Sequence, residues 1–215
     1  MSQSASLPSE AGSETASRSG ESAPAHVSHL ADPGAWAVTA FATTSFMLGM
    51  YNAHLINAGG AVIVIPVALF FGGLVQIIVA ILEVLRGNVF GAVVFGTYGP
   101  FWVIYGVLLT VYAAEIPSSA INSALALFLA MFAVITFYFV IAALRTDMVL
   151  VAVFALIFIG LVLLAIGAGE ANTGLTKAGG WVTLAFAVLA WYHAAGDVIG
   201  YTFGRRVLPM GSLHR

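Results

Sequence analysis

The sequence contains no cysteine and very few charged residues. Only 7% of its 215 residues are Asp, Glu, Lys or Arg, against about a quarter in soluble domains. The absence of cysteine excludes disulfides, thiolate metal sites and a cysteine nucleophile. The net charge is −2 and the chain has no basic block. We therefore expect a membrane protein that does not bind nucleic acid.

The motifs of several enzyme classes are also missing. The chain has no G-x-S-x-G, no H-E-x-x-H and no glycine-rich loop with a P-loop lysine. Its single lysine, Lys177, lies outside the predicted membrane spans, so no retinal Schiff base can form inside one. No metal-binding motif matches the spacing of the possible ligands His54, His193 and Asp197. We expect no catalytic residue, no metal and no cofactor, although an intramembrane enzyme stays open as a minor alternative.

Long apolar runs are abundant. The chain is 61% hydrophobic with a mean hydropathy of +1.03, and runs of the ~20 residues that cross a bilayer recur along it. A helix satisfies its own backbone hydrogen bonds in lipid. These runs predict an all-α integral membrane protein with one membrane domain over residues 32–204, whose six spans lie at about residues 35–56, 61–85, 89–114, 120–144, 148–168 and 180–201.

The two ends of the chain lie outside this predicted membrane domain. Residues 1–31 are rich in Ser, Ala, Glu and Gly, a composition that favours disorder because it buries little apolar surface. They contain no apolar segment of the kind found in secretory signals. The first span is therefore expected to act as its own insertion signal, and residues 205–215 form a short C-terminal tail.

The basic residues predict the orientation in the membrane. Six arginines fall on one side of the predicted spans and Lys177 falls alone on the other; the arginines are Arg18, Arg86, Arg145, Arg205, Arg206 and Arg215. The positive-inside rule then places both termini in the cytoplasm.

Polar residues within the spans indicate where solute could pass. Span 2 carries Gln76 in a stripe of small residues, which is either a helix-packing seam or one wall of a path. Span 6 carries His193 and Asp197 four residues apart, either a structural pair beside a small-residue packing face or a proton path. Glu83 and Arg86 are expected to form an interfacial ion pair. Span 5 is almost uniformly apolar and is expected to face lipid.

Several motifs, in order and at matching spacing, resemble those of the acetate uptake transporters, a family that includes bacterial succinate–acetate permeases and fungal ammonia/acetate exporters. The resemblance covers residues 32–211 and rests on Phe71-Gly72-Gly73-x-x-Gln76, Leu82-Glu83, Arg86-Gly87-Asn88-x-Phe90-Gly91, Thr97-Tyr98-Gly99-x-Phe101-Trp102 and Phe203-Gly204-Arg205-x-Val207-Leu208-Pro209-x-Gly211.

The resemblance implies six helices around a pore in each protomer, a homo-hexameric ring, and uptake of acetate or succinate across the plasma membrane by a channel-like or proton-coupled route. It further implies that Phe41 and Phe71 form a hydrophobic pore constriction and that Glu83 is functional. Asp32 stands at the pore mouth where the family has Asn, and so adds a negative charge there.

The chemistry of these residues agrees with such a substrate. A protonated acid enters a low-dielectric pore at far lower cost than a carboxylate. We expect Thr44, Asn52, Gln76 and Tyr98 to line the pore and donate hydrogen bonds, and Glu83, His193 and Asp197 to act as pore acids or proton relays. Two other interpretations remain: a channel for ammonia, formate or water, and a receptor or scaffold that signals through residues 1–31.

Overall fold

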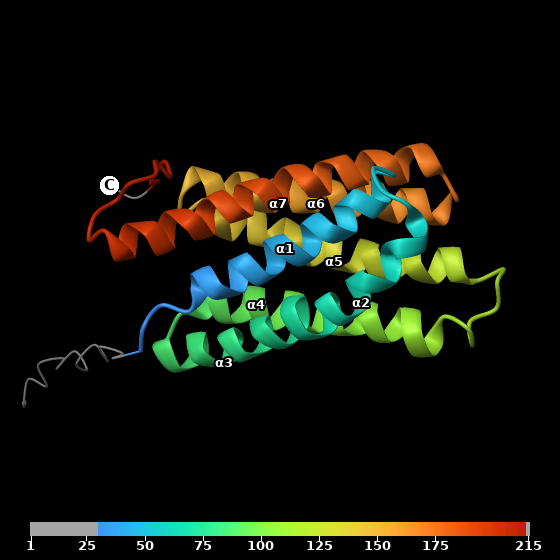
Figure 1. Ribbon diagram of the computed structural model, residues 1–215, viewed down its shortest axis with the longest axis horizontal. Helices are drawn as coiled ribbons and strands as arrows, with labels where there is room; N and C mark the ends of the chain where they lie inside the picture. The colour runs from blue at the N-terminus through green and yellow to red at the C-terminus, as the bar shows by residue number, and fades with distance from the viewer. Residues whose placement is uncertain (1–29, 214–215) are drawn as a thin grey trace, which may run out of the picture.

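The computed structural model describes residues 30–213, which form a bundle of long helices (Figure 1). Helix α1 spans Gly34–Asn52, and the second span is built from η1 (Ala58–Ile63), α2 (Val64–Pro66), η2 (Val67–Val75) and α3 (Gln76–Arg86). The remaining segments are α4 (Val89–Val107) with η3 (Leu108–Tyr112), α5 (Ile121–Ala143), α6 (Met148–Gly169) and α7 (Thr173–Thr202). The predicted disordered segment lies almost entirely outside the described residues.

The helices have the lengths and composition of membrane spans. Five helical segments within residues 30–213 are long and apolar enough to cross a membrane. The sixth, α1, has 19 residues, or about 28 Å at 1.5 Å per residue, close to the ~30 Å of a hydrocarbon core. The prediction of an all-α membrane protein is confirmed.

Two span ends differ from the sequence prediction. Helix α1 ends at Asn52 rather than at residue 56, because His54 has a left-handed backbone (φ 58°). Helix α7 begins at Thr173 rather than at residue 180, with the side chain of Asn172 accepting hydrogen bonds from its first free N–H groups. Lys177 therefore lies in the first two turns of α7, a helix of 30 residues that is longer than the ~30 Å of a hydrocarbon core.

The six spans close into a ring. Helix α1 packs against α7, α7 against α6, and α6 against α5, while η2 and α3 pack between α1 and α4. The wall between α4 and α5 is made by aromatic side chains: the Phe101 ring lies 5.2 Å from Phe128 and 4.8 Å from Phe132, centre to centre. These rings hold the two helices apart and complete the circle.

Glycines allow the closest contacts within the ring. A Cβ on Gly180 of α7 would collide with backbone atoms of Asn52 and Ala53 at the end of α1. Between η2 and α4, a Cβ on Gly99 would lie 3.0 Å from the carbonyl oxygen of Gly73. Small residues at such crossings let helix backbones approach one another. The glycine pair at residues 72 and 73 thus packs span 2 into the ring.

Span 2 departs from regular α-helix over its central part. Segment η2 is π-helical and begins directly after Pro66, where the missing proline N–H removes one helical hydrogen bond. At its other end, the backbone N–H of Gln76 donates to the carbonyl of Gly73. The side-chain amide of Gln76 donates to the carbonyl of Gly72, at 2.6 Å. Gln76 therefore satisfies backbone groups where the helix returns to α geometry.

The uniform apolar composition of helix α6 had suggested that it faces lipid, but one side of the helix is buried in the protein. It packs between α5 and α7 and buries Val153, Phe154, Ile157, Gly160, Leu161, Ala165 and Gly167. The prediction is wrong because an unbroken apolar sequence has no polar face that would reveal which side points inward.

The C-terminal residues 203–213 fold back over the end of the bundle, and we call them the C-terminal strap (Figure 1). The N–H of Met148 donates to Gly211, and the N–H of Leu213 donates to Thr146. Met210 is buried against Gly196 of α7. The strap therefore fixes the start of α6 to the end of α7.

Candidate functional site

Two cavities lie inside the ring. The Asn52 cavity has a volume of about 210 Å³ and is lined by residues of α1, α4, α5, α6 and α7, among them Ser45, Asn52, Trp102 and Thr183. The Glu83 cavity has a volume of about 180 Å³ and is lined by Asp32, Gln76, Glu83, His193 and Asp197, among others. Each is more than ten times the ~10–15 Å³ that holds one water molecule on this measure.

Three residues line both cavities and form a neck between them: Phe41 of α1, Tyr98 of α4 and Ile157 of α6. The rings of Phe41 and Tyr98 lie 5.3 Å apart, centre to centre. Phe41 also stacks on Phe186 of α7 at 5.7 Å. The neck is therefore an apolar constriction whose walls are held by further aromatic contacts.

The hydroxyl of Tyr98 is fixed on the side of α5. It lies 2.7 Å from the hydroxyl of Thr136, and Thr136 itself donates to the carbonyl of Phe132. Because a threonine hydroxyl has one hydrogen to donate, Tyr98 is the donor in the pair. Its phenol hydrogen is thus committed to the protein, and the ring itself faces the neck.

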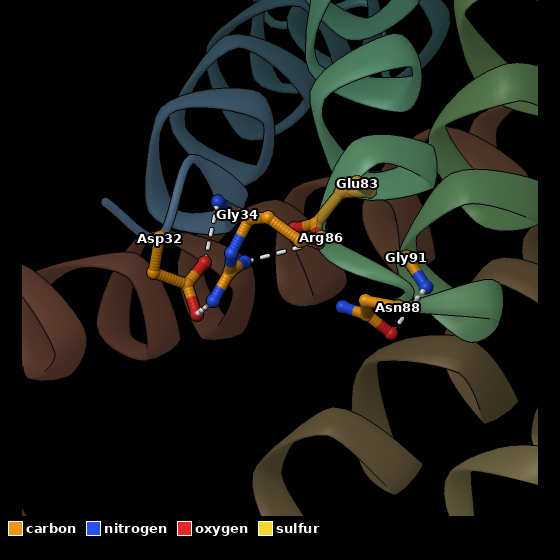
Figure 2. Close-up of polar contacts among 6 residues, drawn as sticks. All are labelled: Asp32, Gly34, Glu83, Arg86, Asn88 and Gly91. Carbon is orange, nitrogen blue, oxygen red and sulfur yellow. Dashed lines mark hydrogen bonds and ion pairs between the residues drawn. The ribbon is translucent and has the colours of Figure 1, made fainter. Parts of the chain in front are cut away.

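Three charged side chains meet at the mouth of the Glu83 cavity (Figure 2). The guanidinium of Arg86 lies 3.1 Å from Asp32 and 3.0 Å from Glu83. Glu83 is 1% exposed, whereas the side chain of Asp32 is 70% exposed. The predicted Glu83–Arg86 ion pair is confirmed, and Asp32 joins it from the start of α1.

Asn88 completes this corner of the cavity. Its side-chain oxygen accepts from the N–H of Gly91, 3.1 Å away, and caps α4 (Figure 2). A Cβ on Gly91 would lie 2.7 Å from the Asn88 amide nitrogen and 3.1 Å from the Glu83 carboxyl carbon. Gly91 therefore leaves the space in which these two side chains meet.

His193 lies between two carboxylates. Its Nε2 is 3.1 Å from Asp147 and its Nδ1 is 3.3 Å from Asp197, so the predicted His193–Asp197 pair forms and gains a third member. Asp147 precedes α6 and accepts from the N–H of Leu150. Burial alone would raise the pKa of Asp147, but the hydrogen bonds from His193 and Leu150 hold it below its usual value. This group joins the Glu83 cavity to the C-terminal strap.

Sequence comparison places these features in a known family. A profile described as the GPR1/FUN34/yaaH family matches residues 15–207. The chain belongs to this family.

Two microbial proteins have sequences similar to this chain. The succinate-acetate/proton symporter SatP of Escherichia coli (strain K12) is 31% identical over 86% of this chain and 97% of its own length. Ammonia transport outward protein 2 of Saccharomyces cerevisiae is 32% identical over 82% of this chain, which spans only 64% of the yeast protein. Among solved structures, the bacterial acetate channel SatP matches 85% of this chain and 99% of its own, with a TM-score of 0.79 and 31% identity.

The structure brings most of the sequence-predicted residues to the two cavities. Phe41, Tyr98, Asn52, Gln76, Asp32, Glu83, His193 and Asp197 line one or both. Thr44 and Phe71 line neither. The Thr44 hydroxyl donates to the carbonyl of Ala40, and its side chain packs where a Gly72 Cβ would be. Phe71 is half-buried beside the small residues that occupy the inner face of η2.

The residues that sequence reasoning missed include Ser45, Trp102, Asp147 and Ile157. Asp147 carried a signal, since an aspartate directly before a long apolar run is typical of a helix N-cap. Trp102 stands in the Thr97–Trp102 motif that supported the family resemblance. Ile157 and Ser45 carried none, because nothing in the sequence distinguishes them from their apolar or hydroxyl neighbours.

Proposed function

We propose that this protein is a plasma-membrane transporter or channel for acetate and related small monocarboxylic acids, with succinate as a further candidate substrate. The observation that carries the proposal is a pair of cavities in line, separated by the neck of Phe41, Tyr98 and Ile157. The names of the relatives, a succinate-acetate/proton symporter and an acetate channel, support the same solute class.

The charge of the pathway favours passage of the neutral acid. Among the described residues, no lysine or arginine lines either cavity, and the neck is apolar. An isolated carboxylate in such surroundings is strongly disfavoured, whereas the protonated acid needs only hydrogen-bond partners. Glu83, His193 and Asp197 are the groups through which a proton would then leave or join the pathway. On this basis we expect weak binding and fast passage.

The arrangement of the arginines supports one direction for the pathway. Arg86 lies at the end of α3, Arg145 between α5 and α6, and Arg205 and Arg206 after α7, all at the end of the bundle where the Glu83 cavity opens. Lys177 lies near the start of α7, at the other end. By the positive-inside rule we place the Glu83 cavity and both termini on the cytoplasmic side.

We also propose that the protein forms a homo-oligomer, with the ring of six that the family resemblance implies. Val84, Leu85, Leu127 and Val134 expose large apolar side chains on α3 and α5, which in a membrane face lipid or another protomer. Native mass spectrometry of the protein released from lipid nanodiscs tests this. If only a species with the mass of a single chain is detected under every release condition, the proposed homo-oligomer is contradicted.

Uptake of labelled acetate into liposomes that contain the purified protein tests the transport proposal. Ile157→Trp should fill the neck and lower uptake at least tenfold, whereas Ile159→Trp, at a position 44% exposed on the same helix, should leave it unchanged. If the parent protein admits acetate no faster than empty liposomes do, the proposal is wrong. An imposed proton gradient then separates proton-coupled entry, whether by symport or as the neutral acid, from conduction of the acetate anion.

A second solute is favoured by one observation. The Glu83 cavity is lined by three carboxylates, from Asp32, Glu83 and Asp197, and such a lining suits a small cation such as ammonium. Competition between acetate and methylammonium in the same liposomes distinguishes the two. Inhibition of acetate uptake by methylammonium, with methylammonium itself accumulating, would favour this alternative.

A further inference from the structure

The Asn52 cavity contains two buried polar groups that have no partner in the protein. The hydroxyl oxygen of Ser45 and the indole nitrogen of Trp102 make no hydrogen bond, although these residues are 1% and 3% exposed. Of the buried side-chain polar atoms in residues 30–213, only one other lacks a hydrogen bond, His193 Nδ1, and it faces Asp197. Buried polar groups are nearly always paired, so two in one cavity require an explanation.

Ser45 differs from every threonine on its own helix. The hydroxyls of Thr39, Thr43 and Thr44 each donate to a carbonyl four residues earlier in α1. This local bond is the usual way in which a hydroxyl within a membrane helix is satisfied. Ser45 makes no such bond and lines the cavity instead.

Trp102 is held so that its indole cannot turn to find a partner. A Cβ on Gly72 would lie 2.8 Å from Trp102 Cγ, so the ring rests directly on that glycine. Phe101 and Tyr105 meet the ring edge-to-face, with centroids 5.2 and 6.0 Å away. By contrast, the indole of Trp191, outside the cavity, donates to Thr43 at 3.1 Å. Of these two indoles, the one that lines the cavity is the one without a partner.

We infer that Ser45 and Trp102 donate hydrogen bonds to the carboxyl group of a small carboxylic acid bound in the Asn52 cavity. The inference rests on the proposed transport function and names the groups that recognise the solute. An indole N–H only donates, so the occupant must offer an acceptor, as a carboxyl group does and an ammonium ion does not. Leu125, Leu129 and Leu164 supply the apolar lining that suits a methyl group.

The indole resonance of Trp102 reports this contact directly. The chain has four tryptophans, so protein with ¹⁵N-labelled indoles in lipid nanodiscs should give four signals. The variants Trp36→Phe, Trp181→Phe and Trp191→Phe each remove one signal and identify Trp102 by exclusion, without changing the site. On titration with acetate at acid pH, the Trp102 signal should shift and the Trp191 signal should stay in place.

Two variants measure the contribution of each donor. Ser45→Ala should raise the apparent dissociation constant, and the half-saturation concentration for uptake, from a few-fold to about tenfold, the effect of one lost hydrogen bond. Trp102→Phe should do the same where it folds. Thr39→Val is the control, because Thr39 lies on the same helix but lines neither cavity, and its hydroxyl already donates to Ala35. Ser45→Ala should leave the unfolding temperature unchanged, since it breaks no bond within the protein.

The outcomes separate this inference from the proposed function. If the parent protein transports acetate but its Trp102 signal does not shift, or if Ser45→Ala keeps the parental affinity, the inference is wrong and the function stands. A Trp102 signal that shifts equally with pH alone, without acetate, reports a titrating group of the protein and also overturns it. If the parent protein transports no acetate, the proposed function fails first.

Discussion

Removal of Arg86 should destabilise the protein far more than removal of Asp32, although the two form one ion pair. Asp32 is mostly exposed, and its pair with Arg86 at 3.1 Å is of the surface type, worth about 0–1 kcal/mol. Glu83 is 1% exposed and has Arg86 at 3.0 Å. Arg86→Met leaves this buried carboxylate without its cation, which typically costs about 3–5 kcal/mol. Asp32→Asn should cost about 1 kcal/mol or less.

A double variant separates the loss of the pair from the loss of packing by the arginine side chain. In Arg86→Met/Glu83→Gln no charge remains buried, so we expect most of the lost stability to return. Reversible unfolding in mixed micelles with increasing SDS, followed by tryptophan fluorescence, measures the free energies. Arg145→Met, at an exposed position at the same end of the bundle, is the control and should change stability by about 0.5 kcal/mol or less.

Two results would refute this reasoning. The first is an Arg86→Met variant no less stable than Arg145→Met, which would mean that Glu83 is already neutral or well hydrated in the folded protein. The second is a double variant as unstable as Arg86→Met alone, which would mean that the arginine acts through packing. The first result would mean that Glu83 is not held there as a fixed, buried charge.

Three further predictions concern stability. Gly180→Ala should cost at least about 1–3 kcal/mol by the same unfolding assay, since its Cβ would meet backbone atoms that cannot yield. Asp147→Asn keeps the helix cap but weakens the hydrogen bond from His193, and should lower the free energy of unfolding by about 1–2 kcal/mol at pH 7. Because the pKa of Asp147 is lowered on folding, the difference in stability between variant and parent should shrink as the pH falls below about 4. Met210→Ala should loosen the C-terminal strap and speed trypsin cleavage there several-fold, because Met210 is the buried contact with Gly196.

Each of these has a simple check. For the glycine, Gly96→Ala is the control, because the nearest atom to a Cβ there is the Ala80 methyl group at 3.6 Å; equal effects at both positions would contradict the backbone clash. For Asp147, a difference that persists unchanged at pH 3 would contradict the assigned charge. For Met210, unaltered cleavage after Arg205 and Arg206 would show that other contacts hold the strap.

The spans could be predicted from sequence because crossing a bilayer needs only length and apolar composition. Their faces could not be predicted equally well. Helix α6 shows this: Ile157 lines the neck, whereas Ile159, two residues further on, is exposed. Both are isoleucines within the apolar run of residues 148–168, so the sequence does not distinguish them. Without polar residues to mark a period, the inward face is decided by contacts with α5 and α7.

The site was predicted where chemistry is local and missed where it depends on three-dimensional packing. His193 and Asp197 are four residues apart on one helix, so their proximity follows from helix geometry. Asp147 contacts His193 only because α6 packs against α7 in the folded protein. Phe71 and Thr44 were misplaced for a related reason: the inner face of η2 is filled by Ala68, Gly72 and Gly73, which leaves no room there for a large ring.

The three parts of the pathway differ in a way that suits a weak acid. The Asn52 cavity offers neutral donors, the neck offers only apolar and aromatic surface, and the Glu83 cavity offers carboxylates. A neutral acid meets no unpaired charge in the first two parts. An acetate anion formed in the third part meets three carboxylates, two of which share the single cation Arg86, so the net charge there opposes it. With that cavity on the cytoplasmic side, as we propose, repulsion favours release into the cytoplasm. Asp32→Asn should then make return of the anion easier while leaving entry of the acid unchanged.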